Sequence, residues 1–343
     1  MNRLWILLVV FALIATPAIA KKQAAEEPSK EEEKSMSAST FSGLEFRNIG
    51  PAINSGRVSD LAVHPEKHHI VYVATASGGL WKTTNGGIVW EPIFDKEGSY
   101  AIGCVTLDPN NPNVVWVGTG ENNSQRSVAF GDGVYKSLDG GQNWENVGLK
   151  ESEHIGTITV DPRDSNVVFV AAQGPLWNSG GDRGVYKTTD GGETWERVLH
   201  VSDDTGINEV HMDPRDPDVL YAASYQRRRH VWTLVNGGPE SAIYKSTDAG
   251  ATWRKITEGL PDGDKGGFFR STNRGESWEK MSDYVSGSPQ YYNEIFADPK
   301  DVDRVYGMDT FLQITLDGGK TFNRVGEKNK HVDNHAIWID PDH

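Results

Sequence analysis

The chain has 343 residues and a formal net charge of −14 at pH 7. This charge argues against nucleic acid as a partner, because phosphate binding needs a basic face. The single cysteine, Cys104, has no disulfide partner in the chain, so we expect a small buried apolar residue there. About 300 residues are enough to bury a core without disulfides.

The first forty residues have no pattern of a folded domain. Residues 1–20 place Arg3 before an apolar run and end in Ala-Ile-Ala, which are the features of a signal peptide. The run is too short to span a membrane, and no other stretch is long and apolar enough. Residues 21–40 are charged and are expected to form a disordered linker. The sequence therefore predicts an exported protein with a folded part over residues 41–343.

One eight-residue motif, the Asp box, recurs six times in the folded part. Its pattern is Ser/Thr-x-Asp/Asn-x-Gly-x-x-aromatic. The copies are TTNGGIVW (residues 83–90), SLDGGQNW (137–144), TTDGGETW (188–195), STDAGATW (246–253), STNRGESW (271–278) and TLDGGKTF (315–322). Each copy lies between two short strand-like pieces, so the motif is expected to be the turn that joins them.

A second motif precedes each Asp box, with one exception. It reads apolar-x-Asp-Pro, then Asp/Asn-rich residues, then Val-Val/Leu-aromatic, as in TITVDPRDSNVVFV. Together the two motifs give four antiparallel strands about every fifty residues, which is typical of a propeller blade. The sequence predicts an all-β fold, a β-propeller of four-stranded Asp-box blades with about seven units expected.

The spacing of the boxes predicts that this propeller is incomplete. Their aromatic residues are separated by 54, 51, 58, 25 and 44 residues. The short interval lacks the Asp-Pro strand pair, so we expect a fifth blade with fewer than four strands. The last residues, HAIWIDPDH, begin a further unit that stops after one turn, and we expect a truncated last blade.

The boxes themselves are expected to be structural. The carboxylate or amide accepts hydrogen bonds from its own turn, the glycine supplies a positive φ, and the aromatic residue is buried against the sheets. The residues assigned to this structural role are Asn85, Asp139, Asp190, Asp248, Asn273 and Asp317.

A ligand site is expected at the opposite face, where the innermost strands begin. Alternation places the residues one, three, five and seven positions before the Asp-Pro site on one side of each strand. That side changes from apolar to polar toward the strand start. This register gathers Arg57, His154, Tyr291, Asp333 and His335 around a central funnel.

Long loops between the second and third strands point at the same funnel mouth. They cover residues 120–133, 173–184 and 224–241. Exposed Trp, Tyr and Arg side chains suit recognition of a sugar or a peptide. The candidates are Glu121, Arg126, Trp177, Tyr225, Arg228 and Trp232. The alternative is that these loops pack on one another, with the arginines paired to nearby acids.

The segment HVDNH (residues 331–335) contains a possible metal site. An inner strand would place His331, Asp333 and His335 on one side. Such a trio also arises by chance or forms hydrogen bonds only. No other cofactor is expected.

The boxes and Asp-Pro strand pairs resemble the Asp-box (BNR) repeat families, which include sialidases, xyloglucan-active glycoside hydrolases, the sortilin luminal domain and photosystem II assembly factors. FRNIGPAINSGRVSDLAVHP, VATASGGLWKTTNGG and YQRRRHVWTLVNGGPESAIYKSTDAG are similar to a large exported bacterial family usually labelled glycosyl hydrolase or sortilin N-terminal-like. The resemblance covers residues 41–343 and implies a periplasmic or extracellular location.

Two functions remain open at this point. One is a binding or scaffold propeller that recognises a peptide, protein or glycan. The other is a glycoside hydrolase, which needs two flanking carboxyl groups or a sialidase-like Tyr and Arg cluster. The sialidase signature is absent, because FRNI departs after its arginine. Ala76 stands where the resemblance to xyloglucanases implies a catalytic Asp.

Overall fold

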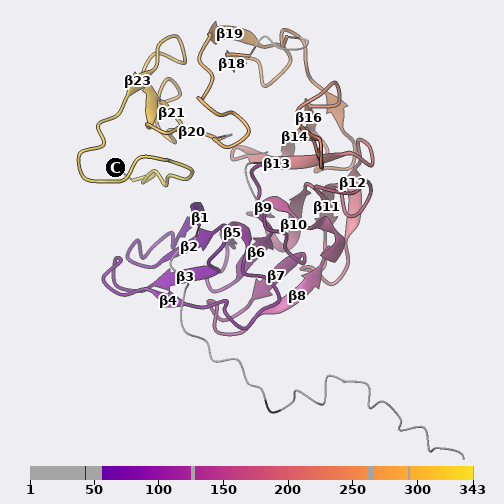
Figure 1. Ribbon diagram of the computed structural model, residues 1–343, viewed down its shortest axis with the longest axis vertical. Helices are drawn as coiled ribbons and strands as arrows, with labels where there is room; N and C mark the ends of the chain where they lie inside the picture. The colour runs from indigo at the N-terminus through magenta and orange to yellow at the C-terminus, as the bar shows by residue number, and fades with distance from the viewer. Residues whose placement is uncertain (1–42, 44–55, 125–127, 262–265, 293, 343) are drawn as a thin grey trace, which may run out of the picture. The chain divides into compact units, whose positions relative to one another are not determined.

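A computed structural model describes Gly43 and residues 56–124, 128–261, 266–292 and 294–342. The chain divides into two units at residues 49 and 50, and the second, Gly50–His343, contains every strand described here. Figure 1 shows how the sheets of this second unit follow one another in chain order. Within the described ranges, no helix has the length and apolar character that a membrane span needs.

The strands form six antiparallel sheets, which we call blades one to six. Blade one contains β1 (Val58–Val63), β2 (Val71–Thr75), β3 (Leu80–Thr83) and β4 (Glu91–Pro92). Blade two contains β5 (Ile102–Leu107), β6 (Val115–Thr119), β7 (Val134–Ser137) and β8 (Glu145–Gly148), followed by the 3-10 helix η2 (Lys150–Ser152). Blade three contains β9 (Ile155–Asp161), β10 (Asp164–Ala172), β11 (Gly184–Thr188) and β12 (Glu196–Leu199).

The later blades depart from this plan in two places. Blade four contains β13 (Thr205–Asp213), β14 (Asp216–His230), β16 (Ala242–Ser246) and β17 (Arg254–Lys255), with β15 (Thr233–Asn236) paired to the end of β14. Blade five contains β18 (Phe268–Arg270) and β19 (Glu279–Ser282). Blade six contains β20 (Ile295–Ala297), β21 (Val305–Gly307), β22 (Gln313–Thr315) and β23 (Asn323–Arg324).

This topology confirms the predicted all-β propeller and its incomplete state. In the described residues, blades one, two, three and six have four strands in meander order, and blade four has the same plan with β15 added. The fifth blade has two strands there, as the 25-residue spacing predicts. The last segment differs from the expectation. Residues 331–342 contain no strand, so the beginning of a seventh unit does not form a sheet here.

The core lies between blades rather than inside one central layer. Tyr72 and Leu80 of blade one pack against Val105 and Val117 of blade two. Equivalent clusters join blade two to three and blade three to four. The next cluster belongs to blade six and the segment after it, around Met308. The apolar packing between neighbours is therefore continuous from blade one to blade four.

A β-bulge in each of the first four inner strands changes the predicted alternation. The pairing register shifts between Val58 and Asp60, and at the same place in β5, β9 and β13. A bulge places two residues opposite one and re-aims the following side chain. The central channel is therefore lined by side chains two and four positions before the Asp-Pro site, such as Asp60 and Glu209. The sequence analysis had assigned the odd positions to one side of the strand.

Side chains at these positions bond the backbone of the next inner strand. The Asp60 carboxylate accepts from the Val105 amide at 2.9 Å, and the Thr157 hydroxyl accepts from the Val210 amide at 2.9 Å. Inner strands have an unpaired edge that needs such partners. Each of the first three blades therefore hydrogen-bonds part of the free edge of the next inner strand.

The Asp-box side chains form hydrogen bonds within their own turns. In blade three, Thr188 Oγ1 accepts from the amides of Asp190 and Gly192, and Asp190 Oδ1 accepts from the Thr194 amide at 2.9 Å. Gly192 has φ 100°, which favours glycine. In the other five boxes the glycine amide likewise donates to the Ser or Thr hydroxyl. These bonds draw the two ends of each turn together.

The box tryptophans are half-buried, not buried as the sequence predicts. Three of them contact the outer part of the preceding blade, whereas the Trp253 indole donates to Gly250 of its own box. The indoles of Trp144, Trp195 and Trp278 donate to Ile93, Val147 and Ile256 carbonyls of that blade at 2.8–3.1 Å. Trp90 in the first box is 38% exposed.

A lysine before each of the first four boxes makes the reciprocal contact. Lys136 Nζ donates to the Gly191 carbonyl of the following box at 2.8 Å and lies 4.8 Å from the centroid of the Trp116 ring. Lys82, Lys187 and Lys245 repeat this arrangement toward Gly140, Ala249 and Arg274. Hydrogen bonds to an ammonium group and cation–π contacts each stabilise by about 0.5–3 kcal/mol. The sequence analysis did not identify these lysines.

Replacement of Asp190 tests whether the box carboxylate works through hydrogen bonds alone. We expect Asp190→Ala to lower the melting temperature by a few degrees, since the Thr194 amide and hydroxyl lose their acceptor. Asp190→Asn should stay close to wild type, because Asn85 and Asn273 accept the same amide bond in their own boxes. Thermal melting followed by circular dichroism measures both. Equal melting temperatures for the two variants would contradict this role.

Candidate functional site

Four of the five residues predicted at the funnel lie in contact. The Arg57 guanidinium carbon is 5.2 Å from the centroid of the Tyr291 ring, and the Tyr291 and His335 rings are 4.5 Å apart. His335 Nε2 is 3.6 Å from an oxygen of Asp333. Arg57 precedes β1, Tyr291 precedes β20, and the other two belong to the segment after blade six. We call these four residues the mouth cluster.

Glu121 and Asn123 hold the arginine of the mouth cluster. Arg57 forms an ion pair with the Glu121 carboxylate and donates to Asn123 Oδ1 at 2.6 Å. The two side chains of the ion pair are 14% and 4% exposed, so the pair is mostly shielded from water. Gly120, with φ 89°, positions Glu121, and a Cβ there would lie 1.9 Å from the Glu153 carbonyl oxygen. Arg57 is therefore preoriented with its charge largely neutralised.

The histidine of the mouth cluster is uncharged at neutral pH. Burial, followed by the positive charge of Arg57, lowers the pKa of His335 to about 4, although Asp333 opposes this change. The Tyr292 hydroxyl donates to Asp333, and burial raises the pKa of that tyrosine to about 12. Asp333 has φ 82°, a conformation that side chains other than Gly, Asn and Asp resist. An aspartate in this conformation that also accepts a hydrogen bond from a tyrosine suits a preorganised polar site.

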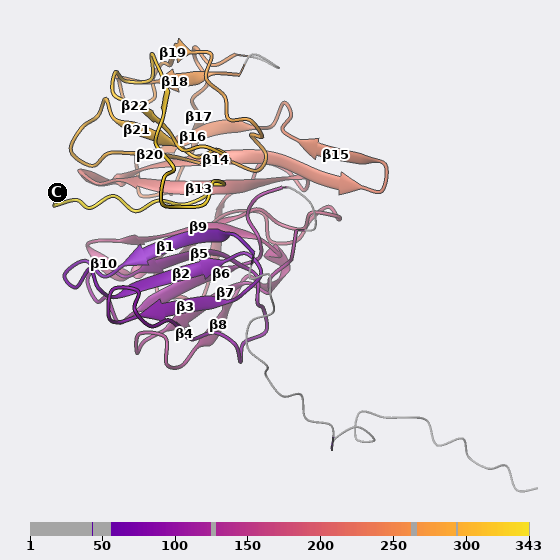
Figure 2. The same ribbon diagram turned by 60° about the vertical axis from the view of Figure 1, so that its left-hand side comes forward.

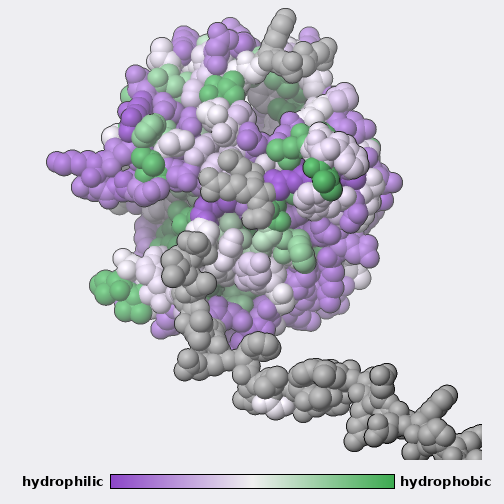
Figure 3. All heavy atoms as spheres, viewed as in Figure 1, coloured by the Kyte–Doolittle hydropathy of each residue, from purple (hydrophilic) through white to green (hydrophobic). Residues whose placement is uncertain are grey.

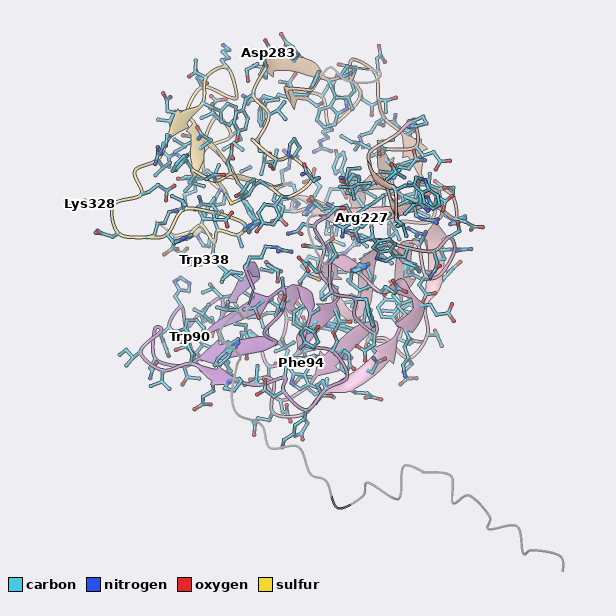
Figure 4. The ribbon with its side chains drawn as sticks, viewed as in Figure 1. Trp90, Phe94, Arg227, Asp283, Lys328 and Trp338 are labelled. Atoms are coloured by element: carbon cyan, nitrogen blue, oxygen red, sulfur yellow. The ribbon has the colours of Figure 1, made fainter. Side chains whose placement is uncertain are left out.

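His154, the fifth predicted residue, lies apart from the mouth cluster. It is 1% exposed, and burial followed by the charge of Arg227 lowers its pKa well below the ordinary value. Arg227 is itself buried and donates to the carbonyls of Asn122 and Asn123 at 3.0–3.1 Å. Figure 4 shows Arg227 among the inner elements of the blades. Neither His154 nor Arg227 is open to a ligand in this structure.

The predicted loop over residues 224–241 is in fact a β-hairpin. β14 continues to His230 and turns directly into β15, and Figure 2 shows this hairpin extending beyond the rest of its sheet. Its tip exposes Trp232, which is 82% exposed and stacks on His230 at 5.3 Å. Main-chain pairing explains the difference, since RRRH and TLVN are four-residue strands in register.

The remaining rim candidates are divided between exposed and paired positions. Trp177 is 52% exposed, on the loop whose Leu176 carbonyl accepts from the hairpin amide of Arg229 at 2.9 Å. Arg228 pairs with Asp204 and donates to Ser179, which agrees with the alternative that these arginines meet nearby acids. Tyr225 is half-buried at the hairpin base. Arg126 lies outside the described residues.

The predicted metal trio does not assemble. His331 is exposed and turns its Nδ1 to the Val332 carbonyl, because the segment lacks the strand geometry that would align the three side chains. Among the described residues, the group of three possible ligands that lie within 4.8 Å of one another is His68, Asp340 and Asp342. This group joins blade one to the last segment, where Trp338 also packs edge-on against His68 at 5.2 Å (Figure 4).

The central channel contains carboxyl groups that the sequence analysis missed. A cavity of about 290 Å³ is lined by Asp60, Glu209 and Glu294 from blades one, four and six. Burial raises the pKa of Asp60 to about 6, and burial with the charges of Glu209 and Asp60 raises the pKa of Glu294 well above its ordinary range. Asp60, Glu209 and Glu294 each lie four positions before the Asp of the Asp-Pro motif in their repeat, or before the residue that replaces it. That shared position in the repeat was the signal that could have found them.

Comparisons with known proteins agree with this architecture. The family model for Sortilin-Vps10, described as sortilin, neurotensin receptor 3, matches residues 132–262. A xyloglucanase of Hypocrea jecorina is 27% identical over 242 residues, which cover 63% of this chain and 27% of that protein. A xyloglucanase of Acetivibrio thermocellus is 26% identical over 226 residues, which cover 58% of this chain and 25% of that protein.

A solved structure shows the same fold. The GH74 xyloglucanase from Xanthomonas campestris superposes with a TM-score of 0.61 at 18% identity, covering 86% of this chain and 50% of that one. This chain therefore spans about a quarter of the length of the curated relatives and half of the solved one. The molecule is an Asp-box β-propeller similar to xyloglucanases and to sortilin. The comparisons confirm the resemblance to xyloglucan-active glycoside hydrolases and to sortilin that the motifs predict.

The pKa of His335 makes stability depend on pH. The folded-state value of about 4 lies below the ordinary value of 6.5, so the unfolded chain binds the proton more tightly. We expect unfolding free energy to decrease as pH falls from about 6.5 to 4, by an amount on the order of 2 kcal/mol from this residue. Urea titrations at several pH values measure the slope. His335→Gln should reduce it, whereas His331→Gln, an exposed control, should leave it unchanged.

Proposed function

We propose that this chain is an exported binding propeller that captures a peptide, protein or glycan at the funnel mouth. The observation that carries the proposal is the convergence of Arg57, Tyr291, Asp333 and His335 from distant parts of the sequence. Groups from different elements meeting at one site are the usual form of a binding site. The site offers aromatic faces, a carboxylate and a guanidinium edge, which suit hydroxyl and amide groups of a ligand.

The exposed rim tryptophans support the same proposal. Trp177 and Trp232 expose large apolar surfaces on two elements joined by a main-chain hydrogen bond. Figure 3 shows that hydrophobic side chains form small patches on an otherwise hydrophilic face. Tryptophans that stay exposed in this setting favour a surface that binds a partner. The protein's location outside the cytoplasm is part of the proposal and follows from the features of residues 1–20.

Replacement of Trp232 separates binding from folding. We expect Trp232→Ala to weaken ligand binding about tenfold or more and to leave the melting temperature unchanged, because the side chain is 82% exposed. A glycan array and a peptide library screened with the full chain identify the ligand, and calorimetry then compares the variants. Ile88→Ala, 83% exposed on the first Asp box, is the matched control. Equal losses in both variants would contradict a site at the mouth.

A test of Arg57 in ligand binding needs a second substitution, because Arg57→Ala alone also affects stability. Arg57→Ala leaves the Glu121 carboxylate buried without its partner, and breaking a buried ion pair costs about 3–5 kcal/mol of stability. We therefore pair it with Glu121→Gln. The double variant should fold and bind more weakly than Glu121→Gln alone. Unchanged affinity in the double variant would remove Arg57 from the site.

A glycoside hydrolase is the second candidate, and one observation favours it. The carboxyl groups of Asp60 and Glu294 have raised pKa values, as general acids require, and the curated relatives are xyloglucanases. Ala76 at the position of the expected catalytic Asp, and the pairing of Glu121 with Arg57, favour binding instead. We expect no release of reducing ends from xyloglucan by the full chain. Release of reducing ends by the wild-type chain that disappears in Asp60→Asn would make the glycoside hydrolase the better-supported function.

A further inference from the structure

The fifth blade keeps its outer half and the contacts of that half with both neighbours. Toward blade four, Lys245 donates to the Arg274 carbonyl and Trp278 donates to the Ile256 carbonyl. Toward blade six, Arg270 pairs with Asp303, and Phe268 packs edge-on against Phe322 at 5.2 Å. The outer half is therefore anchored on both sides, and the deficit of blade five is confined to its inner half.

Within the described residues, this deficit leaves one edge of β18 without a paired strand. In the described residues β18 pairs with β19 alone, whereas the corresponding strands β11 and β16 have partners on both edges. A free edge presents amide and carbonyl groups that favour the addition of another strand. The three residues Phe268–Arg270 are long enough to pair with a short extended peptide.

An apolar cavity lies beside this edge. Its volume is about 540 Å³, within the range of roughly 300–1,000 Å³ that ligand pockets occupy. Its walls come from three successive blades, with Ile243 on blade four, Phe269 on blade five and Met308 on blade six. Tyr284 also lines it, and the hydroxyl of that tyrosine is buried without a hydrogen-bond partner. The cavity offers apolar side-chain pockets and an unsatisfied polar group.

The inner end of the cavity is acidic. Glu294 lines both this cavity and the central channel, where it faces Glu209 and Asp60. Burial and these two negative charges disfavour ionisation of Glu294. A positive charge beside Glu294 would relieve that effect. The charge of the site thus complements a lysine or arginine.

We propose that the gap in blade five is a docking site for an extended segment of a partner protein, which adds to β18 as a strand, fills the cavity with alternate apolar side chains and places a lysine or arginine beside Glu294. The main-chain pairing supplies affinity, and the cavity and Glu294 supply selectivity. This site adjoins the funnel mouth at Tyr292, which lines the cavity and donates to Asp333 of the mouth cluster. It extends the proposed binding function to a second surface with its own ligand chemistry.

The chain itself provides a suitable probe. Residues 163–172, RDSNVVFVAA, contain the whole of β10, which occupies the equivalent place beside β11 in blade three. We would prepare this peptide with a fluorescent label in two forms, with lysine or with uncharged norleucine in place of Ala171. The full chain is titrated into each peptide, and fluorescence anisotropy reports binding. We expect saturable binding of both, with the lysine peptide at least about tenfold tighter.

Three variants of the chain make the test specific. Ile243→Trp fills the cavity and should abolish binding of both peptides, whereas Ile88→Trp on an exposed box should have no effect. Glu294→Gln should remove the preference for the lysine peptide while the norleucine peptide still binds. Absence of binding to the wild-type chain, or binding that Ile243→Trp leaves unchanged, would overturn the proposal. A chain that is dimeric, and becomes monomeric in Ile243→Trp, would identify a second copy as the occupant and overturn it as well.

Discussion

The hydrogen bonds that cross from one blade to the next are the contacts on which this structure depends. A lysine reaches forward to the following Asp box, and the tryptophan of that box reaches back to the outer edge of the preceding blade. Closer to the channel, side chains such as Asp60 bond the free edge of the next inner strand. Each blade alone is a small sheet with two apolar faces. These reciprocal bonds set the distance and angle at which neighbouring faces can pack.

The same arrangement explains where function can lie. The box carboxylates are occupied by their own turns, and the strand faces are covered by neighbouring blades. Chemistry is left to the strand starts, the connections above them and the channel. The mouth cluster lies at the strand starts, and the hairpin with Trp232 is one of the connections. Asp60, Glu209 and Glu294 line the channel.

Periodic features of the sequence were sufficient to predict most of the fold. The boxes fix the blade count, and the 25-residue interval fixes the position of the two-stranded blade. The channel lining was not predictable from strict alternation, because bulges at Ser59 and its equivalents re-aim the side chains. The hairpin over Arg227–His230 and Thr233–Asn236 was predicted as a loop because it lies in the long interval between the second and third strands of its blade. The contact of Arg57 with Tyr291 was predictable only in outline, since it depends on how far apart the first and last blades lie.

Nearest-neighbour bonding has a consequence for how the molecule opens. In an array of units that contact only their neighbours, stability is close to a sum of unit and interface contributions, and local opening begins where an interface is weakest. The continuous apolar clusters run from blade one to blade four. Blades five and six are joined by a few ring contacts, such as Phe268 with Phe322, and by the surface pair of Arg270 with Asp303. Amide hydrogen exchange should therefore be fastest in β18 to β23. Blades one to four would then form the more stable part of the molecule, and blades five and six the part that opens locally. A ligand bound to blade five or six would reduce this local opening without changing the structure of blades one to four.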